Sequence, residues 1–377
     1  MPISITPVRT ARQLNRFIGM VWDIYKGDPN WVPPVKFDRK RLLNRQKNPF
    51  WQHSQFEMFL AERDGQVVGR VAAIINGNHN ATYGDKVGFF GFFESINDQE
   101  VANRLLAAAQ QWLAERGMEV MRGPVNPSLN DEAGLLVEGF DDPPQILMTY
   151  NPKYYSTVIE TFGLAKSKDM FAYRLTRSFL TEKIQRVQSA VRQREGLTIR
   201  SVDFSDKTAF QRDVETIKDI YNMAWQANWG FVKMTDAEFD FIAKDLKQLA
   251  DPDFVLIAEA NGQPVGFALG LPDINQVLIQ NKSGGLLGAI LAMLRFRKRI
   301  NRGRIFILGV IPRFQRLGID AVLYYEVGTR MVDGKGYREG EASWVVEDNV
   351  MMNRAAQMMN GELYKRYRLY DKIIKKN

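Results

Sequence analysis

The sequence predicts an α/β protein with a mixed α+β sheet, arranged as two similar domains in tandem. Two observations favour this fold class. A hairpin pattern occurs twice, at residues 59–69 and 256–266. Around each copy the expected elements follow one order (helix, hairpin, strand, helix, strand), and such repetition indicates duplication. Hydrophobic residues make up 45% of the 377 residues, so cores of ordinary size can form.

The two hairpin segments read FLAERDGQVVG and LIAEANGQPVG, and they are identical at six of eleven aligned positions. Each contains an Asp-Gly or Asn-Gly pair, at Asp64-Gly65 and Asn261-Gly262. Such pairs are typical of type I′ turns, because both central residues need a positive φ. Chance similarity of two hairpins is the alternative to duplication, and the surrounding elements argue for duplication.

In the first half, a helical pattern at 11–25 precedes the hairpin. The hairpin leads to an aromatic strand at 87–95 and then to an amphipathic helix at 99–117, which ends at a glycine. A strand at 118–125 comes next.

The second half repeats this order. A helical pattern at 209–226 precedes the hairpin, which leads after an insertion to a strand at 305–311. A helix at 319–336 and a strand at 341–346 come next. The charged segment 178–196 is expected to form a connecting helix, so the predicted domains are 1–177 and 197–377.

The segment 310-VIPRFQRLGIDA-321 joins the strand at 305–311 to the next helix. A strand, a glycine-containing turn and a helix form an arrangement that binds phosphate, since the first helical turn leaves backbone N–H groups unpaired. Gly318 has no Cβ to keep an anion from the backbone. Arg313 and Arg316 add positive charge around the turn.

This turn resembles the acyl-CoA-binding motif of the GNAT superfamily of N-acyltransferases, Arg/Gln-x-x-Gly-x-Gly/Ala after a strand that often ends Val-x-Pro. Val310, Pro312, Gln315 and Gly318 match that motif. Asp320 stands where the family has Gly or Ala. The order of elements over most of residues 197–377 also agrees with the family.

A second GNAT motif, Asn-x-x-Ala-x-x-Leu-Tyr, is similar to the segment 349-NVMMNRAAQMMNG-361. Asn353, Ala356 and Met359 match its first three places, and Asn360 stands in the place of the tyrosine. In the family that tyrosine often protonates the departing thiolate.

The resemblance implies two GNAT-like domains, with an opening between strands 305–311 and 341–346 that holds the pantetheine arm of acetyl-CoA or another acyl-CoA. The amine would attack the thioester directly, and the Val310 N–H would stabilise the oxyanion. The residues expected to bind this cosubstrate are Leu308, Val310, Gln315, Arg316, Leu317, Gly318, Ile319, Asp320, Ala321 and Asn353.

An ammonium substrate must lose a proton before it attacks. Glu347, at the end of the strand 341–346, is the preferred general base, while Glu341 lies at the start of that strand. Tyr364 and Tyr367 are candidates for the acid that protonates the thiolate. A surface ion pair for Glu347, and a plain strand at 363–372 for the tyrosines, are the structural alternatives.

The corresponding turn of the first half, 93-FESINDQE-100, lacks glycine and carries Glu94, Asp98 and Glu100. Acids complement the helix dipole there but repel a pyrophosphate. We therefore expect a degenerate copy that binds no CoA. The long segment 122–155 is either a loop that closes a substrate cleft, with Asn126, Asn130, Glu132, Tyr150, Asn151 and Tyr154 as contacts, or a solvated connection.

The composition excludes several classes of site. There is no cysteine, which excludes thiol nucleophiles, disulfides and cysteine-ligated metals. Only His53 and His79 occur, so no metal site is expected. The N-terminus has no apolar signal core, and we expect a cytoplasmic location. The net charge of +8 favours anionic ligands, but the chain has no zinc-finger or RNP signature, which disfavours nucleic acid as a partner.

The apolar run 284-GGLLGAILAML-294 leads directly into the basic run 295-RFRKRINRGR-304. It is shorter than the ~20 residues of a membrane-spanning helix. Two interpretations stay open. The run is either a buried helix whose basic end reaches solvent, or an interfacial segment at 284–304 that makes peripheral contact with anionic lipid or a lipidic substrate.

The function predicted from the sequence is acyl-CoA-dependent N-acyl transfer, with acetyl as the expected group and a small-molecule amine or amino-acid-like compound as acceptor. The acceptor, the acyl-chain length and the oligomeric state are left open. A non-catalytic CoA-binding or scaffold module is one alternative, favoured by Asp320 and Asn360. A tandem GNAT-like transferase that uses aminoacyl-tRNA is another, which the basic balance allows.

Overall fold

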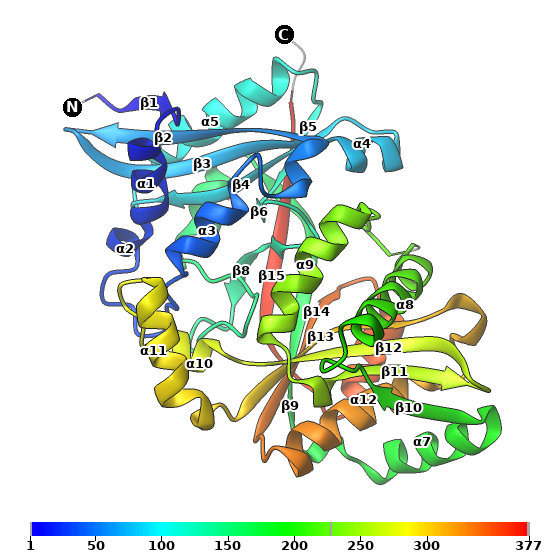
Figure 1. The fold of residues 1–377 in the computed structure, drawn as a ribbon. Helices are drawn as coiled ribbons and strands as arrows, with labels where there is room; N and C mark the ends of the chain where they lie inside the picture. The colour runs from blue at the N-terminus through cyan, green and yellow to red at the C-terminus, as the bar shows by residue number, and fades with distance from the viewer. Residues whose placement is uncertain (1, 227, 375–377) are drawn as a thin grey trace. The chain divides into compact units, whose positions relative to one another are not determined.

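The computed structural model describes residues 2–226 and 228–374 of the chain. These residues form two compact units that are interleaved in the sequence (Figure 1). The first unit contains the residues up to Met170, Leu278–Ala292 and the residues from Lys365 onward. The second contains Phe171–Val277 and Met293–Tyr364. The predicted domain boundaries at 177 and 197 describe the duplication along the chain and stay a prediction.

The sheet of the first unit has the strand order β1-β2-β3-β4-β5-β15, and β8 also pairs with β15. Its ladders are antiparallel except for β4 and β5, which are parallel. Residues 125–126 and 132–133 pair separately as a two-stranded sheet, β6-β7. The strands are β1 Ser4–Pro7, β2 Ser54–Arg63, β3 Gln66–Asn76, β4 Val87–Ser95, β5 Val120–Gly123, β6 Val125–Asn126, β7 Glu132–Ala133, β8 Leu135–Glu138 and β15 Glu362–Ile373.

Helix α5 (Gln99–Ala114) provides much of the core of the first unit, packed on β2 and β3. Asp98 caps it by accepting hydrogen bonds from the N–H groups of Glu100 and Val101. The chain leaves the helix at Gly117, whose φ of 76° is left-handed. The other helices are α1 Ala11–Gly19, α2 Val21–Ile24, α3 Lys36–Leu42, η1 Pro49–Gln52, α4 Gly77–Tyr83 and α6 Tyr155–Thr161.

The sheet of the second unit has the order β9-β14-β13-β12-β11-β10. Two cores lie on its opposite faces, since the neighbours Phe267 and Ala268 of β12 belong to different clusters. Phe267 packs with Ile220 and Tyr221 of α8, whereas Ala268 packs in the core that includes α12. The strands are β9 Ala165–Thr176, which begins in the first unit, β10 Leu197–Ser201, β11 Val255–Ala260, β12 Gln263–Pro272, β13 Arg302–Val310 and β14 Glu339–Val346.

The helices of the second unit include the predicted connecting helix, which is α7 and packs against α12. Two further helices, α10 and α11, cross the division between the units. The bounds are η2 Arg177–Phe179, α7 Glu182–Glu195, α8 Lys207–Trp225, α9 Asp236–Leu249, η3 Pro252–Phe254, α10 Asn275–Leu278, α11 Leu286–Phe296, η4 Arg297–Arg299, η5 Pro312–Phe314, α12 Ile319–Thr329, η6 Arg330–Gly334 and α13 Val350–Met358.

The same construction occurs in both units, as the sequence repeat predicts. The hairpin turns have positive φ at Asp64 (55°), Gly65 (77°), Asn261 (49°) and Gly262 (77°). The ladder between each hairpin and the strand that follows it carries a register shift, between Arg70 and Ala72 of β3 in one unit and between Leu269 and Gly270 of β12 in the other. The next ladder is parallel and short in both, joining 87–89 to 120–122 and 302–305 to 339–342.

Two predicted helices differ from the structure. The helix expected at 11–25 is broken after Gly19 into α1 and α2, in keeping with the low helix propensity of glycine. The helix expected at 319–336 is α-helical only to Thr329 and continues as the π-helix Arg330–Gly334. Within residues 2–226 and 228–374, we find no helix with the length and apolar character needed to cross a membrane.

Within the first unit, an ion pair joins the last strand of the chain, β15, to its neighbour β5. Arg122 Nε and Nη2 donate to Asp371 Oδ1 and Oδ2 at 2.8 and 2.7 Å. Both side chains are partly buried, at 17% and 29% exposure. We expect Asp371→Ala to lower the free energy of unfolding by about 1–3 kcal/mol, because it leaves a half-buried guanidinium without its anion.

Urea denaturation of the whole chain measures this effect. The matched control is Lys86→Ala, which removes the exposed Lys86–Glu119 pair (3.0 Å) of the same unit and should cost less than ~0.5 kcal/mol. Equal effects of the two substitutions would contradict the assigned role of Asp371.

Candidate active site

In the second unit, strands β13 and β14 separate after a short ladder. Their parallel register runs from Arg302–Glu339 to Ile305–Ala342, whereas β13 continues to pair with β12 as far as Val310. Residues 306–310 of β13 therefore line one side of a gap in the sheet, which we call the strand opening. The ladder ends within the segments 305–311 and 341–346, between which the sequence predicts an opening. The opening as a ligand site stays a prediction.

Main-chain groups of β13 face the strand opening. Ile311 N donates to Val265 O on the β12 side, and alternate residues of a strand face opposite edges. Val310 and Leu308 therefore direct their N–H and C=O groups away from β12. Two side chains already bind the carbonyls: Gln315 Nε2 donates to Val310 O at 3.0 Å, and Trp225 Nε1 donates to Leu308 O at 3.2 Å. The N–H groups are the donors that a ligand would meet.

The chain leaves β13 through the short helix Pro312–Phe314 and enters α12 at Gly318. Gly318 is the N-cap, with a φ of 86°, and Arg316 is also left-handed at 68°. The expected strand, turn and helix therefore form, and the side chains of Arg313, Gln315 and Arg316 are exposed.

The missing Cβ of Gly318 faces helix α7. A Cβ built there would lie 2.9 Å from Val191 Cγ2. Arg194 of the same helix donates through Nη2 to Leu317 O at 2.9 Å. Close packing of α7 and the positive φ thus both require glycine here. From the sequence alone, the glycine is expected to let an anion approach the backbone instead.

Asp320 lies in the first turn of α12 and is mostly buried. Burial raises the pKa of its carboxyl group, while the backbone N–H groups of Ala321 and of Asp320 itself act in the opposite direction. The carboxylate is thus close to the first-turn N–H groups that a diphosphate would use. The negative charge also contributes, after burial, to the raised pKa of Tyr324.

Two asparagines of the second GNAT motif have structural roles. Asn353 Nδ2 donates to Val346 O (3.0 Å) and Asn349 O (2.9 Å), and its Oδ1 accepts from Tyr173 (2.8 Å). It therefore ties α13 to the end of β14. Asn360 has a φ of 55°, a conformation that asparagine tolerates better than tyrosine, which accounts for the departure from the motif.

A buried polar cluster lies around the Arg304–Glu341 pair, the last pair but one of the β13–β14 ladder. Arg304 Nε donates to Ser343 Oγ at 2.8 Å and lies 3.8 Å from Glu341 Oε1, and Arg304 Nη2 donates to Ser343 O at 3.1 Å. Ser343 and Tyr364 each donate a hydrogen bond to the Glu341 carboxylate. Arg304 and Glu341 are 2% and 0% exposed. We call these four residues the Glu341 cluster.

The cluster lies on the α8 face of the sheet. Ile305 belongs to the core that includes α12, so the adjacent Arg304 points to the opposite face. On that face Trp225, Tyr221 and Phe231 form an aromatic group, with ring centroids 5.6 Å apart for Tyr221–Trp225 and 5.4 Å for Tyr221–Phe231. A carboxylate with bound hydroxyl donors thus shares a face with apolar rings beside the opening.

The structure separates the predicted catalytic residues. Tyr364 belongs to the cluster and binds Glu341, whereas Glu347 lies just after β14, where its main-chain O accepts from Asn353 at 3.3 Å. Tyr367 lies in the first unit, fully buried opposite Leu136 of β8. The sequence alone favours Glu347 over Glu341 as the general base. One feature of the sequence points to Glu341. Arg304 and Glu341 carry opposite charges, and they belong to two strands that are expected to be neighbours.

The sequence has relatives of similar length. It is 36% identical over 379 residues to the bacterial ceramide synthase of Caulobacter vibrioides, covering 99% of this chain and 98% of the relative. It is 34% identical over 369 residues to protein YghO of Escherichia coli, covering 96% and 93%. No protein-family model matches the sequence.

Among solved structures, a tandem GNAT protein from the clavulanic acid biosynthesis pathway matches with a TM-score of 0.57 at 11% identity, covering 99% of both chains. The chain belongs to the GNAT superfamily. Its two units are GNAT units in tandem, and the protein is an N-acyltransferase. The predicted family, fold class and enzyme class are therefore confirmed.

The first GNAT unit fills its equivalent opening with its own chain. A Cβ on Gly91 of β4 would lie 1.6 Å from Val125 O, and Phe92 N donates to Asn126 Oδ1 at 2.6 Å. Residues 125–126 thus cover the part of β4 that extends beyond its ladder with β5. The expectation that this copy holds no CoA stays a prediction.

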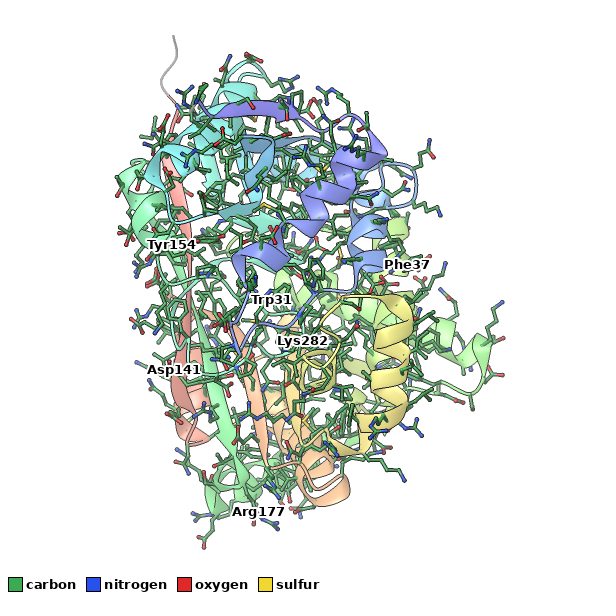
Figure 2. All side chains as sticks on the ribbon, turned by 90° about the vertical axis from the view of Figure 1, so that its left-hand side faces the viewer. Trp31, Phe37, Asp141, Tyr154, Arg177 and Lys282 are labelled. Atoms are coloured by element: carbon green, nitrogen blue, oxygen red, sulfur yellow. The ribbon has the colours of Figure 1, made fainter. Side chains whose placement is uncertain are left out.

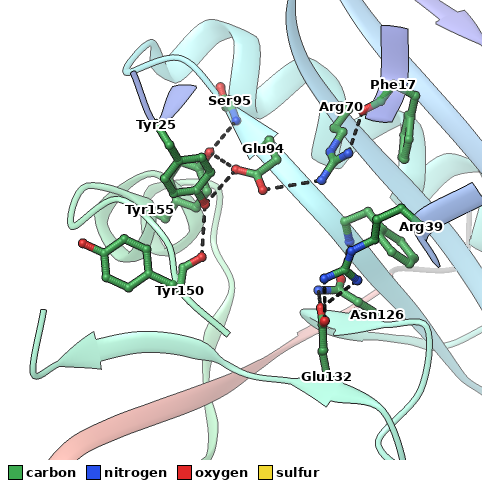
Figure 3. Close-up of polar contacts among 11 residues, drawn as sticks. Phe17, Tyr25, Arg39, Arg70, Glu94, Ser95, Asn126, Glu132, Tyr150 and Tyr155 are labelled. Atoms are coloured by element: carbon green, nitrogen blue, oxygen red, sulfur yellow. Dashed lines mark hydrogen bonds and ion pairs between the residues drawn. The ribbon is translucent and has the colours of Figure 1, made fainter. Parts of the chain in front are cut away.

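Acidic side chains of the first unit form hydrogen bonds and ion pairs with other residues of that unit (Figure 3). Glu94 accepts from Tyr155 at 2.7 Å and Tyr25 at 3.1 Å and lies 3.5 Å from Arg70, and burial raises the pKa of its carboxyl group. In segment 122–155, Glu132 is bound by Arg39 at 2.5 Å. Such contacts hold the segment against the unit, so it is not a freely solvated connection.

The Glu341 cluster of the second GNAT unit yields a stability prediction. Glu341→Ala should lower the free energy of unfolding by about 3–5 kcal/mol, because it leaves Arg304 buried without an anion. Glu362→Ala is the control, since the Glu362 side chain is 64% exposed in its ion pair with Arg174 (3.4 Å), and such a pair should be worth less than ~1 kcal/mol. Chemical denaturation measures both, and a loss below ~1 kcal/mol for Glu341→Ala would refute a tightly coupled cluster.

Proposed function

We propose that this N-acyltransferase transfers a fatty-acyl group from acyl-CoA to the amine of a long-chain amino alcohol. The 36% identity to a bacterial ceramide synthase over nearly the whole chain is the observation that carries the proposal. A ceramide is a long-chain amino alcohol whose amine bears an acyl chain. The acetyl group expected from the sequence is the competing donor, and the relative's name favours the longer one.

The second unit supplies the groups that such a transfer needs. Main-chain N–H groups of Leu308 and Val310 face the strand opening, where they would pair with the pantetheine arm and the thioester oxygen. Exposed Arg313 and Arg316 lie beside the first turn of α12, where a diphosphate would be attracted. The aromatic group around Trp225 offers an apolar wall for a chain.

In the proposed reaction the amine nitrogen attacks the thioester carbonyl carbon, forming the N–C bond. The C–S bond then breaks, and the thiolate of CoA leaves. Glu341 takes the proton that the ammonium group loses before it attacks, and Tyr364 supplies the proton that the thiolate gains. The nitrogen loses a second proton as the amide forms. That proton restores the Tyr364 hydroxyl, and Glu341 passes its own proton to solvent. Arg304 and Ser343 hold the carboxylate of Glu341 in place and touch no reacting atom.

A turnover assay with the whole chain tests this function. We expect palmitoyl-CoA and sphinganine to yield an N-acylated product and free CoA thiol, with acetyl-CoA at least ~10-fold less efficient in kcat/KM. A preference for acetyl-CoA would contradict the fatty-acyl donor and favour the acetyl group that the sequence predicts. Binding of CoA without turnover of either donor would favour the non-catalytic module.

Two substitutions test the assigned groups. Glu341→Gln should lower kcat by ~100-fold or more, and Tyr364→Phe by ~10-fold or more, since each loses a proton-transfer group. Glu347→Gln is the control and should change kcat less than ~3-fold. Circular dichroism confirms folding of each variant. A large loss in Glu347→Gln with little in Glu341→Gln would restore the base predicted from the sequence.

Asp320 gives a pH prediction. Burial raises the pKa of its carboxyl group. The group is neutral below that pKa and becomes negatively charged as the pH rises through it. CoA binding should therefore weaken over that rise, and Asp320→Asn should bind CoA ~3-fold or more tightly at neutral pH.

Isothermal titration with CoA measures this effect, with Arg313→Gln/Arg316→Gln as the opposite variant, expected to weaken binding. Weaker binding by Asp320→Asn would show that the carboxylate helps the ligand. Gly318 is a poor test position because any Cβ there meets Val191.

A further inference from the structure

Helix α11 exposes its large apolar residues and buries its small ones. Leu287, Leu291 and Leu294 are 76%, 65% and 71% exposed, and Leu286 and Ile290 are 45% and 47% exposed. The residues that face the protein are Ala289 and Ala292, at 7% and 8%. An ordinary surface helix has the reverse arrangement, with its large apolar residues turned inward.

The exposed residues form one continuous face. At about 100° per residue, positions 286, 287, 290, 291 and 294 fall within an arc of about 140°. We call these five residues the α11 apolar face.

Phe37 of α3, which is 54% exposed, extends the apolar surface at the start of the helix (Figure 2). The Lys36 N–H donates to Gly284 O at 2.9 Å, and Trp22 Nε1 donates to Lys282 O at 2.7 Å. These bonds fix the start of α11 on the first unit.

Cations flank this face. Arg295, Arg297, Lys298 and Arg299 come within five residues of its last leucine, and all four are exposed. Lys36, Lys40 and Lys282 are exposed near the other end. Exposed leucines bordered by lysine and arginine are the composition of helices that lie in the interface of anionic bilayers.

We propose that the α11 apolar face docks on an anionic lipid bilayer, with the leucines in the acyl-chain boundary and the cations at the headgroups. Helix α11 has 11 residues and is therefore ~16 Å long. The area that one face of so short a helix can bury is small compared with the ~800 Å² that each partner buries in a stable protein dimer. Shallow insertion needs no such area, and the charge complements anionic headgroups.

Vesicle flotation with the whole chain tests the proposal. We expect binding to phosphatidylcholine vesicles that contain about 30 mol% phosphatidylglycerol, little binding to pure phosphatidylcholine, and weaker binding as salt screens the cations. Leu287→Ser/Leu291→Ser should bind ~10-fold more weakly or worse. Arg297→Gln/Lys298→Gln/Arg299→Gln should lose the preference for phosphatidylglycerol.

The chain offers a matched control. Ile373 and Met351 are 77% and 65% exposed, the same as Leu287 and Leu291 within one percentage point, but they lie on β15 and α13. Ile373→Ser/Met351→Ser should bind vesicles like the unchanged protein. Equal loss in both double variants, or no binding to phosphatidylglycerol vesicles at low salt, overturns the proposal.

A third outcome is also decisive. If sedimentation shows a dimer that only Leu287→Ser/Leu291→Ser disperses, and vesicles are not bound, the face joins two copies and the lipid proposal is wrong. These vesicles contain neither amine acceptor nor acyl-CoA, so their binding is independent of the proposed function. Turnover of dispersed sphinganine by the same double variant tests the proposed function, whereas vesicle binding tests the α11 apolar face.

Discussion

The early separation of β13 from β14 is the constraint on which the rest of the site depends. Main-chain N–H and C=O groups need partners, and a sheet normally supplies them along the whole strand. Here the β13–β14 register ends at Ile305–Ala342, and the side chains of Trp225 and Gln315 bind the carbonyls of Leu308 and Val310. The remaining donors point into a gap bordered by the turn at Gly318. An extended ligand with amide and carbonyl groups fits such an edge as a further strand would.

The Glu341 cluster is coupled to that constraint. A buried carboxylate and a buried guanidinium are costly unless each has a partner with good geometry. Arg304 and Glu341 are register neighbours at the end of the ladder, so the sheet itself holds them together. Ser343 and Tyr364 then complete the hydrogen bonding of the carboxylate. The carboxylate that we propose as the general base is thereby held close to the end of the ladder.

Duplication has given one chain two versions of the same construction. Both units have the I′ hairpin, the register shift and the short parallel ladder. They differ in the path of the chain after the second parallel strand. In the first unit, residues 125–126 return across β4 and leave no room for a Cβ at Gly91. Its acids are bound by Tyr155, Tyr25 and arginines rather than left for a ligand.

The amino-acid sequence alone is enough to predict the duplication, the hairpins and most helices and strands, because these depend on local chemistry. Positive φ at Asp64-Gly65 and the cap at Asp98 are properties of a few adjacent residues. It also located the turn at Gly318. Three features are visible only in the folded protein: which acid Tyr364 binds, the direction of the missing Cβ of Gly318 toward α7, and the exposure of the α11 leucines to solvent. Each depends on the register or packing of segments far apart in the chain, which periodicity does not encode.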